Sequence, residues 1–158
     1  MKNLRTITAC LSITLYSLCS SAQTGNTVKV NEPNYNKSKL FENLPEKIQV
    51  NMDNLSGLFS EQVGGSVSLN LSGDESFRFN GDVVSVVSKY ENTIQSIVVR
   101  STNYPGARLT VSKITGANGT ISYTGRIISM QHGDLFELKN VNNQFELEKR
   151  KFHDLVNE

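Results

Sequence analysis

The feature that most constrains the fold is a two-residue alternation of apolar and polar side chains, repeated between residues 67 and 151 and broken at short intervals by turn-forming residues. Alternation with this period places every second side chain on the same face of a β-strand. Its first clear example is Val67, Leu69 and Leu71, which alternate with serine and asparagine. The chain is therefore predicted to be mainly β.

The connections between the alternating segments are short and contain Gly, Asn or Pro, as in residues 103–106, 116–119 and 142–144. Consecutive strands joined by short turns pair with their sequence neighbours as an antiparallel meander. We expect the meander to form a curved roll or small barrel, with a two-sheet sandwich as the open alternative. After residues 77–79, the predicted strands cover residues 94–100, 108–114, 120–130, 135–141 and 145–151.

Two short stretches predict local detail within the meander. Asn118-Gly119 predicts a type I′ hairpin turn, because both residues tolerate positive φ. Four valines do not fit the face of a single regular strand, which predicts either a β-bulge near Gly81 or burial on both faces. These are Val83, Val84, Val86 and Val87.

One short helix is expected near residues 53–63, after an alternating segment at residues 47–52. Asp53 is the predicted N-cap, and Gly64-Gly65 is predicted to stop the helix. Gly57 weakens the helical pattern without removing it. The apolar stripe would consist of Leu55, Leu58, Phe59 and Val63.

The N-terminal residues have the pattern of an export signal. A basic start at Lys2 and Arg5 precedes the apolar stretch 6–19, and Ser20-Ser21-Ala22 supplies the small residues that signal peptidase accepts. We therefore predict a signal peptide at 1–22, a flexible polar arm at 23–39 and a single β-rich domain at 40–158. The predicted location is secreted or periplasmic.

The cysteines and the charge balance exclude several function classes. Cys10 and Cys19 both lie in the predicted signal peptide, so no disulfide or thiolate site is expected after cleavage. Lipid anchoring through Cys19 is a minority alternative, because Leu18 rather than a small residue precedes it. The remaining chain is nearly neutral, which gives no reason to expect nucleic acid as a partner. No integral membrane segment is expected in it, and its protein or small-ligand partner is unknown.

Side chains that attract attention as site candidates have plain structural explanations. His132 is predicted to lie in a hairpin bend, which the flexible backbone of Gly133 permits. In the strand that follows the bend, Phe136 and Leu138 are expected to face the core. No sequence motif for hydrolysis, phosphate binding or metal binding is present, so no catalytic residue, metal ligand or cofactor is assigned. The weak binding candidates are Tyr104, Arg108, Tyr123 and His132, with Tyr35 and Tyr90 as additions if they share a face.

The signal ending SSAQ and the stretch YTGRIISMQHGDLFEL resemble the small exported β-rich proteins of Gram-negative bacteria that have no assigned activity. This resemblance implies export and transfers no catalytic residue. We expect a non-enzymatic binding or structural module that acts through surface loops or an unpaired edge strand. The alternatives are a protease inhibitor or propeptide-like accessory domain that inserts the polar arm, and a carrier of a small lipophilic ligand.

Overall fold

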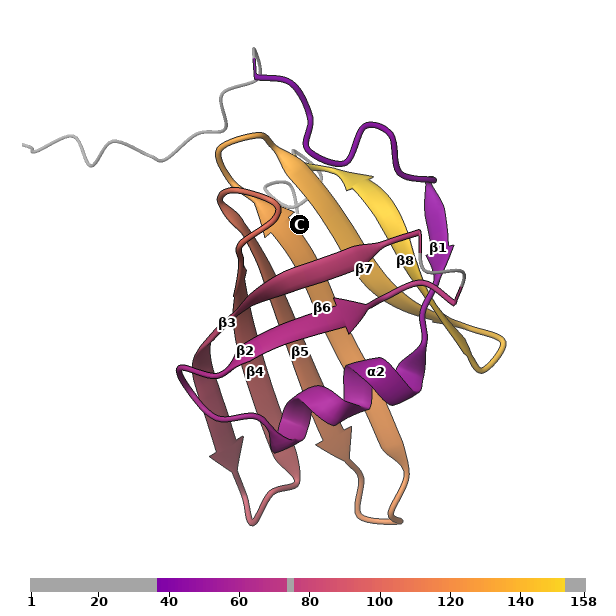
Figure 1. The fold of residues 1–158 in the computed structure, drawn as a ribbon. Coiled ribbons are helices and arrows are strands. Elements are labelled where there is room, and N and C mark those ends of the chain that lie inside the picture. Colours follow the sequence, from indigo (N-terminus) through magenta and orange to yellow (C-terminus); the bar gives the residue numbers. More distant parts are fainter. Residues whose placement is uncertain (1–36, 74–75, 153–158) are drawn as a thin grey trace, which may run out of the picture. The chain divides into compact units, whose positions relative to one another are not determined.

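The predicted meander is present as an antiparallel sheet, curled into a half-barrel, in a computed structural model that describes residues 37–73 and 76–152 (Figure 1). The order of the eight strands is β1-β8-β7-β6-β5-β4-β3-β2, so each strand from β2 to β8 lies beside its sequence neighbours. The strands are β1 (Lys47–Gln49), β2 (Ser66–Asn70), β3 (Arg78–Lys89), β4 (Ile94–Ser101), β5 (Ala107–Thr115), β6 (Ile121–Ser129), β7 (Asp134–Val141) and β8 (Gln144–Lys151). The predicted signal peptide, both cysteines and residues 23–36 of the polar arm lie outside the described residues.

The two edges of the sheet approach each other just beyond the short strand β1. Val50 and Ser72 form an isolated antiparallel bridge, and the amide of Asn51 donates to the carbonyl of Leu71 at 3.2 Å. Both edge segments also keep their bonds to their own neighbours, because Val50 donates to Phe145 and Leu71 donates to Phe77. Within the described residues, the half-barrel is therefore joined across its opening by the Val50–Ser72 bridge.

The core lies on the concave face of the sheet and consists mainly of the apolar strand residues that the alternation predicts. The predicted helix adds Leu55 and Leu58, and Phe41, for which no core position was predicted, is also buried there. Isoleucine, valine, leucine and phenylalanine side chains from successive strands are 0 to 8% exposed there. Phe136 and Leu138 both belong to this set, as expected from the sequence after the His132 bend. The fully buried members with the largest side chains include Phe41, Phe77, Phe79, Leu58, Leu71, Ile97, Leu109 and Ile127.

A β-bulge in β3 explains the four valines. The register with β4 shifts between Val83 and Ser85, so Val84 has no direct partner and the strand changes phase. Val83 points into the core and is 1% exposed, whereas Val86 and Val87 are each 41% exposed. Two residues before the bulge, a Cβ on Gly81 would lie 2.4 Å from the carbonyl oxygen of Arg100. Glycine is required at that position because the backbones of β3 and β4 approach each other too closely for a side chain.

The expected helix is present, with different ends. α2 spans Met52–Gly57 and continues into the 3-10 helix η2 at Leu58–Ser60. Asn51, not Asp53, is the N-cap: its side chain accepts from the amides of Asp53 and Asn54. The helical segment ends at Ser60, before Gly64-Gly65, and Val63 beyond it is 62% exposed. In the described part of the chain, no helix has the length and apolar character that a membrane-spanning segment needs.

The predicted type I′ turn at Asn118-Gly119 is wrong, although the hairpin itself is confirmed. Only Gly119 has positive φ there, and Gly116 accepts from Gly119 and donates to Thr120 in a longer loop. Two successive asparagines with φ of 52° and 64° instead form the turn between β7 and β8. These are Asn142 and Asn143, which occupy the left-handed conformation that a two-residue hairpin requires.

Candidate functional site

His132 lies in the hairpin bend between β6 and β7, as the sequence predicts. Its amide donates to the carbonyl of Ser129 at 3.3 Å, and Gly133 has a φ of 62°. The histidine ring contacts the backbone of a segment far away in the sequence. Nδ1 lies 2.8 Å from the carbonyl oxygen of Ser38 and donates to it, because a carbonyl oxygen only accepts.

This bend holds the segment of residues 38–46, which we call the strap. Lys39 Nζ donates to the carbonyls of His132 at 2.9 Å and Gly133 at 2.7 Å. The amide of Leu40 donates to Asp134 Oδ2 at 2.8 Å, and Asp134 is only 7% exposed. The carboxylate therefore binds a distant amide rather than a local one. The His132 bend therefore has a structural role, because these hydrogen bonds hold the strap against the sheet.

The strap closes one end of the half-barrel with Phe41, which is 1% exposed. Its ring centroid lies 5.2 Å from that of Tyr104, 5.5 Å from that of Phe136 and 6.1 Å from that of Phe77. Such edge-to-face and tilted arrangements are the favourable geometries for aromatic pairs. Farther along the strap, Lys149 donates to the carbonyls of Glu42 and Leu44. The strap is thus fixed by an aromatic anchor and by two lysines.

The other three binding candidates do not form one surface. Tyr104 packs in the aromatic cluster at the strap end, where burial raises the pKa of its hydroxyl. Tyr123 of β6 packs against η2 and β8. Its ring centroid lies 6.1 Å from that of Phe59 and 5.9 Å from that of Phe145. Arg108 is exposed, next to the buried Leu109 that points into the core. The tyrosines therefore contribute mainly to packing, and only the arginine is freely displayed.

Two cavities differ sharply in size and character. The one between the sheet and α2 is apolar and measures about 10 Å³, at the lower limit of the space that one water molecule needs. The other is an open hollow of about 690 Å³ beside the strap, with lysines, an arginine and carboxylates mixed along its walls. The charged residues of its lining are Lys39, Glu42, Glu46, Asp134, Lys149, Arg150 and Lys151.

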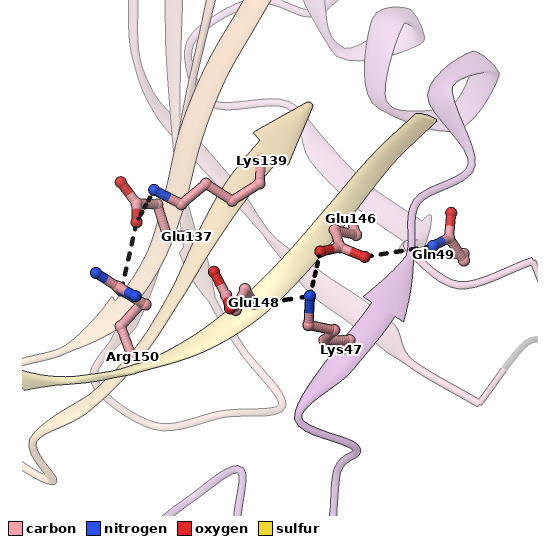
Figure 2. A network of polar contacts seen from close by, with 7 residues as sticks. All are labelled: Lys47, Gln49, Glu137, Lys139, Glu146, Glu148 and Arg150. Carbon is pink, nitrogen blue, oxygen red and sulfur yellow. Dashed lines mark hydrogen bonds and ion pairs between the residues drawn. The ribbon is translucent and has the colours of Figure 1, made fainter. Parts of the chain in front are cut away.

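A network of ion pairs covers the outer face of β1, β7 and β8 (Figure 2). Lys47 Nζ lies 2.8 Å from Glu146 Oε1, whose side chain is 8% exposed. That hydrogen bond, together with the charge of Glu146, raises the pKa of Lys47. In the same network, Glu137 Oε2 lies 2.6 Å from Lys139 Nζ and 3.7 Å from Arg150 Nε. Each carboxylate has a cation beside it, so the network joins neighbouring strands and displays little net charge.

The β3–β4 and β5–β6 hairpins turn at the end of the half-barrel opposite the strap (Figure 1). Apolar side chains of these hairpins remain exposed. The two hairpins touch, because the amide of Thr115 donates to the carbonyl of Thr93 at 2.8 Å. Tyr90 is 73% exposed. We call the exposed set Val86, Val87, Tyr90, Ile114 and Ile121 the tip surface. Strand alternation puts Val86 and Ile121 on the concave side of the sheet and Val87 and Ile114 on its outer side, so the set surrounds the end of the sheet at these two hairpins.

The backbone of the β3–β4 turn is unusual. Tyr90, Glu91 and Asn92 are three successive residues with φ of 52°, 54° and 68°. Residues other than glycine rarely occupy this left-handed region, and such conformations cluster at binding and switch sites. From the sequence, Tyr90 is expected only as an addition to a surface around Tyr104. Its partners in the tip surface were missed, since alternation marks them as ordinary strand residues.

No group of His, Cys, Asp and Glu side chains within residues 37–73 and 76–152 is arranged to hold a metal ion. In comparisons with known proteins, no family model, curated protein or solved structure matches the chain.

Proposed function

We propose that this protein is an exported, non-enzymatic binding module that contacts its partner through the tip surface. The observation that carries the proposal is Tyr90, an aromatic side chain that is 73% exposed on a turn with left-handed backbone. Tyrosine is among the residues that contribute most to protein interfaces. The exposed valines and isoleucines at the same hairpin ends, on both sides of the sheet, supply further apolar contact area for a partner that surrounds this end.

Binding through loops is better supported than binding through an edge strand. β1 has only three residues, and its other edge is paired with β8. A partner strand would therefore have to pair with the free edge of β1, beside Lys47 and Gln49. At the other edge, α2 lies beside β2, and Asn54 Nδ2 donates to the carbonyl of Asn70 at 2.9 Å. Short length, charge and a covering helix are the features that protect sheet edges from pairing with another chain.

The two alternative functions have less support from the described residues. A lipophilic ligand would have to displace core side chains, because the cavity beneath α2 measures about 10 Å³. An inhibitor that inserts the polar arm would use residues 23–36, which lie outside the described residues. At the end of that arm, Ser38 and Lys39 are bound to the β6–β7 turn.

Affinity capture from envelope and secreted fractions of the native cells tests the proposal. Tyr90→Asn removes the ring and places a residue that tolerates positive φ, and Ile121→Thr keeps a β-branched strand residue. Combined, they are expected to weaken retention of the partner by about tenfold or more. The matched control is Val63→Thr with Met130→Gln, which changes two exposed apolar side chains outside the tip surface.

Two results would contradict the proposal. One is a specific partner that the tip variant retains as well as the unchanged protein does. The other is a specific catalytic turnover by the purified protein that is abolished by His132→Ala, since this would make the molecule an enzyme.

A further inference from the structure

The central strands of the sheet lack acidic residues. Between Asn92 and Gly133 the sequence has no Asp or Glu, although the chain contains 15 of them. This span forms β4, β5 and β6 with their connecting turns. It carries four fully charged basic residues, which are Arg100, Arg108, Lys113 and Arg126. Charge is therefore segregated along the sheet, with the positive charge in its middle.

Three of these basic residues gather on the outer face of the sheet. Arg100 of β4 lies directly opposite Arg108 of β5 in the strand register. Arg126 of β6 lies opposite Thr110, which is two residues from Arg108 and on the same face. Since neighbouring strands are about 4.8 Å apart, the three Cα atoms lie within roughly 12 Å of one another. We call Arg100, Arg108 and Arg126 the arginine triad.

The triad points to solvent, because the residues beside it in sequence point into the core. Val99 and Ile127 are 0% exposed and Leu109 is 2% exposed, whereas all three arginines are exposed. Alternation along a strand puts neighbours on opposite faces. The arginines therefore line the convex surface, away from the aromatic cluster and from the tip surface.

None of the ion pairs among the described residues includes a triad arginine. Two carboxylates stand opposite the triad in register, Asp82 beside Arg100 and Glu137 beside Arg126. Asp82 accepts from Ser66 Oγ at 2.8 Å, and Glu137 pairs with Lys139 and Arg150. Like charges directly opposite each other, as at Arg100 and Arg108, destabilise a sheet pair. The carboxylates nearest in register have other partners, and no triad guanidinium is held in an ion pair within the described residues.

We propose that the outer face of β4, β5 and β6 is a docking surface for an acidic protein, with the arginine triad receiving its carboxylates. Guanidinium groups bind carboxylates in a bidentate manner and are enriched in protein interfaces. Val98 and Ile128, both half-buried on this face, supply aliphatic contact between the charges. The inference is independent of the tip surface, because Arg100 and Arg108 lie at the ends of β4 and β5 that are farthest from the tip turns and because the chemistry differs.

An acidic protein fits this face better than other polyanions do. The two tyrosines nearest in the sheet, Tyr104 and Tyr123, pack against core aromatics, so this face presents no ring on which nucleic acid bases stack. Anionic membranes are recognised by denser clusters of about four to eight basic residues. A limited number of arginines set among hydroxyl and aliphatic side chains is instead typical of a protein interface.

Titration of the purified full chain with poly-L-glutamate, followed by calorimetry at low ionic strength and at about 0.15 M salt, tests the proposal. We expect binding that weakens as salt is added. Replacing the triad as Arg100→Gln, Arg108→Gln and Arg126→Gln should weaken it by about tenfold or more. A second variant with lysine at all three positions keeps the charge and should show an intermediate loss, because lysine cannot bind a carboxylate in the bidentate manner.

The matched control removes the same number of charges elsewhere, as Lys37→Gln, Lys89→Gln and Lys151→Gln, all of them exposed. It should leave the affinity within about twofold of the unchanged protein. An equal loss in this control would overturn the proposal, because net charge would then explain the binding. So would absence of poly-L-glutamate binding, or triad-dependent binding only to phosphatidylglycerol vesicles or to single-stranded DNA. Circular dichroism of each variant confirms that the sheet is retained.

Discussion

At one end of the half-barrel the strap inserts Phe41 into the aromatic cluster, and at the other end the hairpins leave Tyr90 and Ile121 in solvent. Both ends belong to the same strands with the same alternation of side chains. The difference comes from the strap, a segment outside the β2–β8 meander that crosses only one end and is held there by Lys39 and Lys149. One end is therefore built for stability, and the other is available for binding.

The largest expected effect comes from breaking the closed end. Phe41→Ala should lower the free energy of unfolding by about 3 to 5 kcal/mol, because a fully buried aromatic side chain leaves a cavity among Phe77, Tyr104 and Phe136. Val86→Ala at the open end, where the side chain is 41% exposed, should cost less than about 1 kcal/mol. Urea unfolding of both variants measures the difference, and equal losses would refute the contrast between the ends.

A smaller effect is expected from the hydrogen bond that holds the strap. Asp134→Ala should cost about 1 to 3 kcal/mol, because it removes the buried acceptor of the Leu40 amide. Amide hydrogen exchange should show faster exchange at Leu40 than in the unchanged protein. Asp82→Ala is the control, since that carboxylate accepts a hydrogen bond from an exposed serine. Unchanged protection of Leu40 in the Asp134 variant would contradict the prediction, because the other strap contacts would then hold this amide without the carboxylate.

The smallest effect concerns pH. Burial raises the pKa of Tyr104 above its ordinary value of 10.0, so the folded protein holds this proton more tightly than the unfolded chain does. Stability should therefore fall as the pH rises from about 10 toward the folded pKa. Tyr104→Phe should reduce this alkaline loss, whereas Tyr90→Phe at the exposed tip should not. Thermal unfolding between neutral and alkaline pH measures the slopes, and identical slopes in the two variants would contradict the prediction.

The candidate site was much less predictable than the fold. Arg108 was recognised from sequence, but its meaning depends on Arg100 and Arg126, which become neighbours only through the strand register. His132 was placed correctly in a hairpin bend, while its contact with Ser38 joins residues 94 positions apart. Contacts over such separations leave no local pattern in one sequence, because neither residue affects the backbone preference of the other.

The sequence by itself determined the strands β2 to β8, their sequential order and the core residues that these strands contribute. Alternation identifies which side chains are buried, and short turns between strands allow only neighbouring strands to pair. Tertiary structure alone decided that β1 pairs with β8, that the strap covers one end, and that the arginine triad collects on one face. The physical reason is that alternation and turn chemistry act over a few residues, whereas the position of a covering segment is set by packing and hydrogen bonds that form only when the sheet is complete.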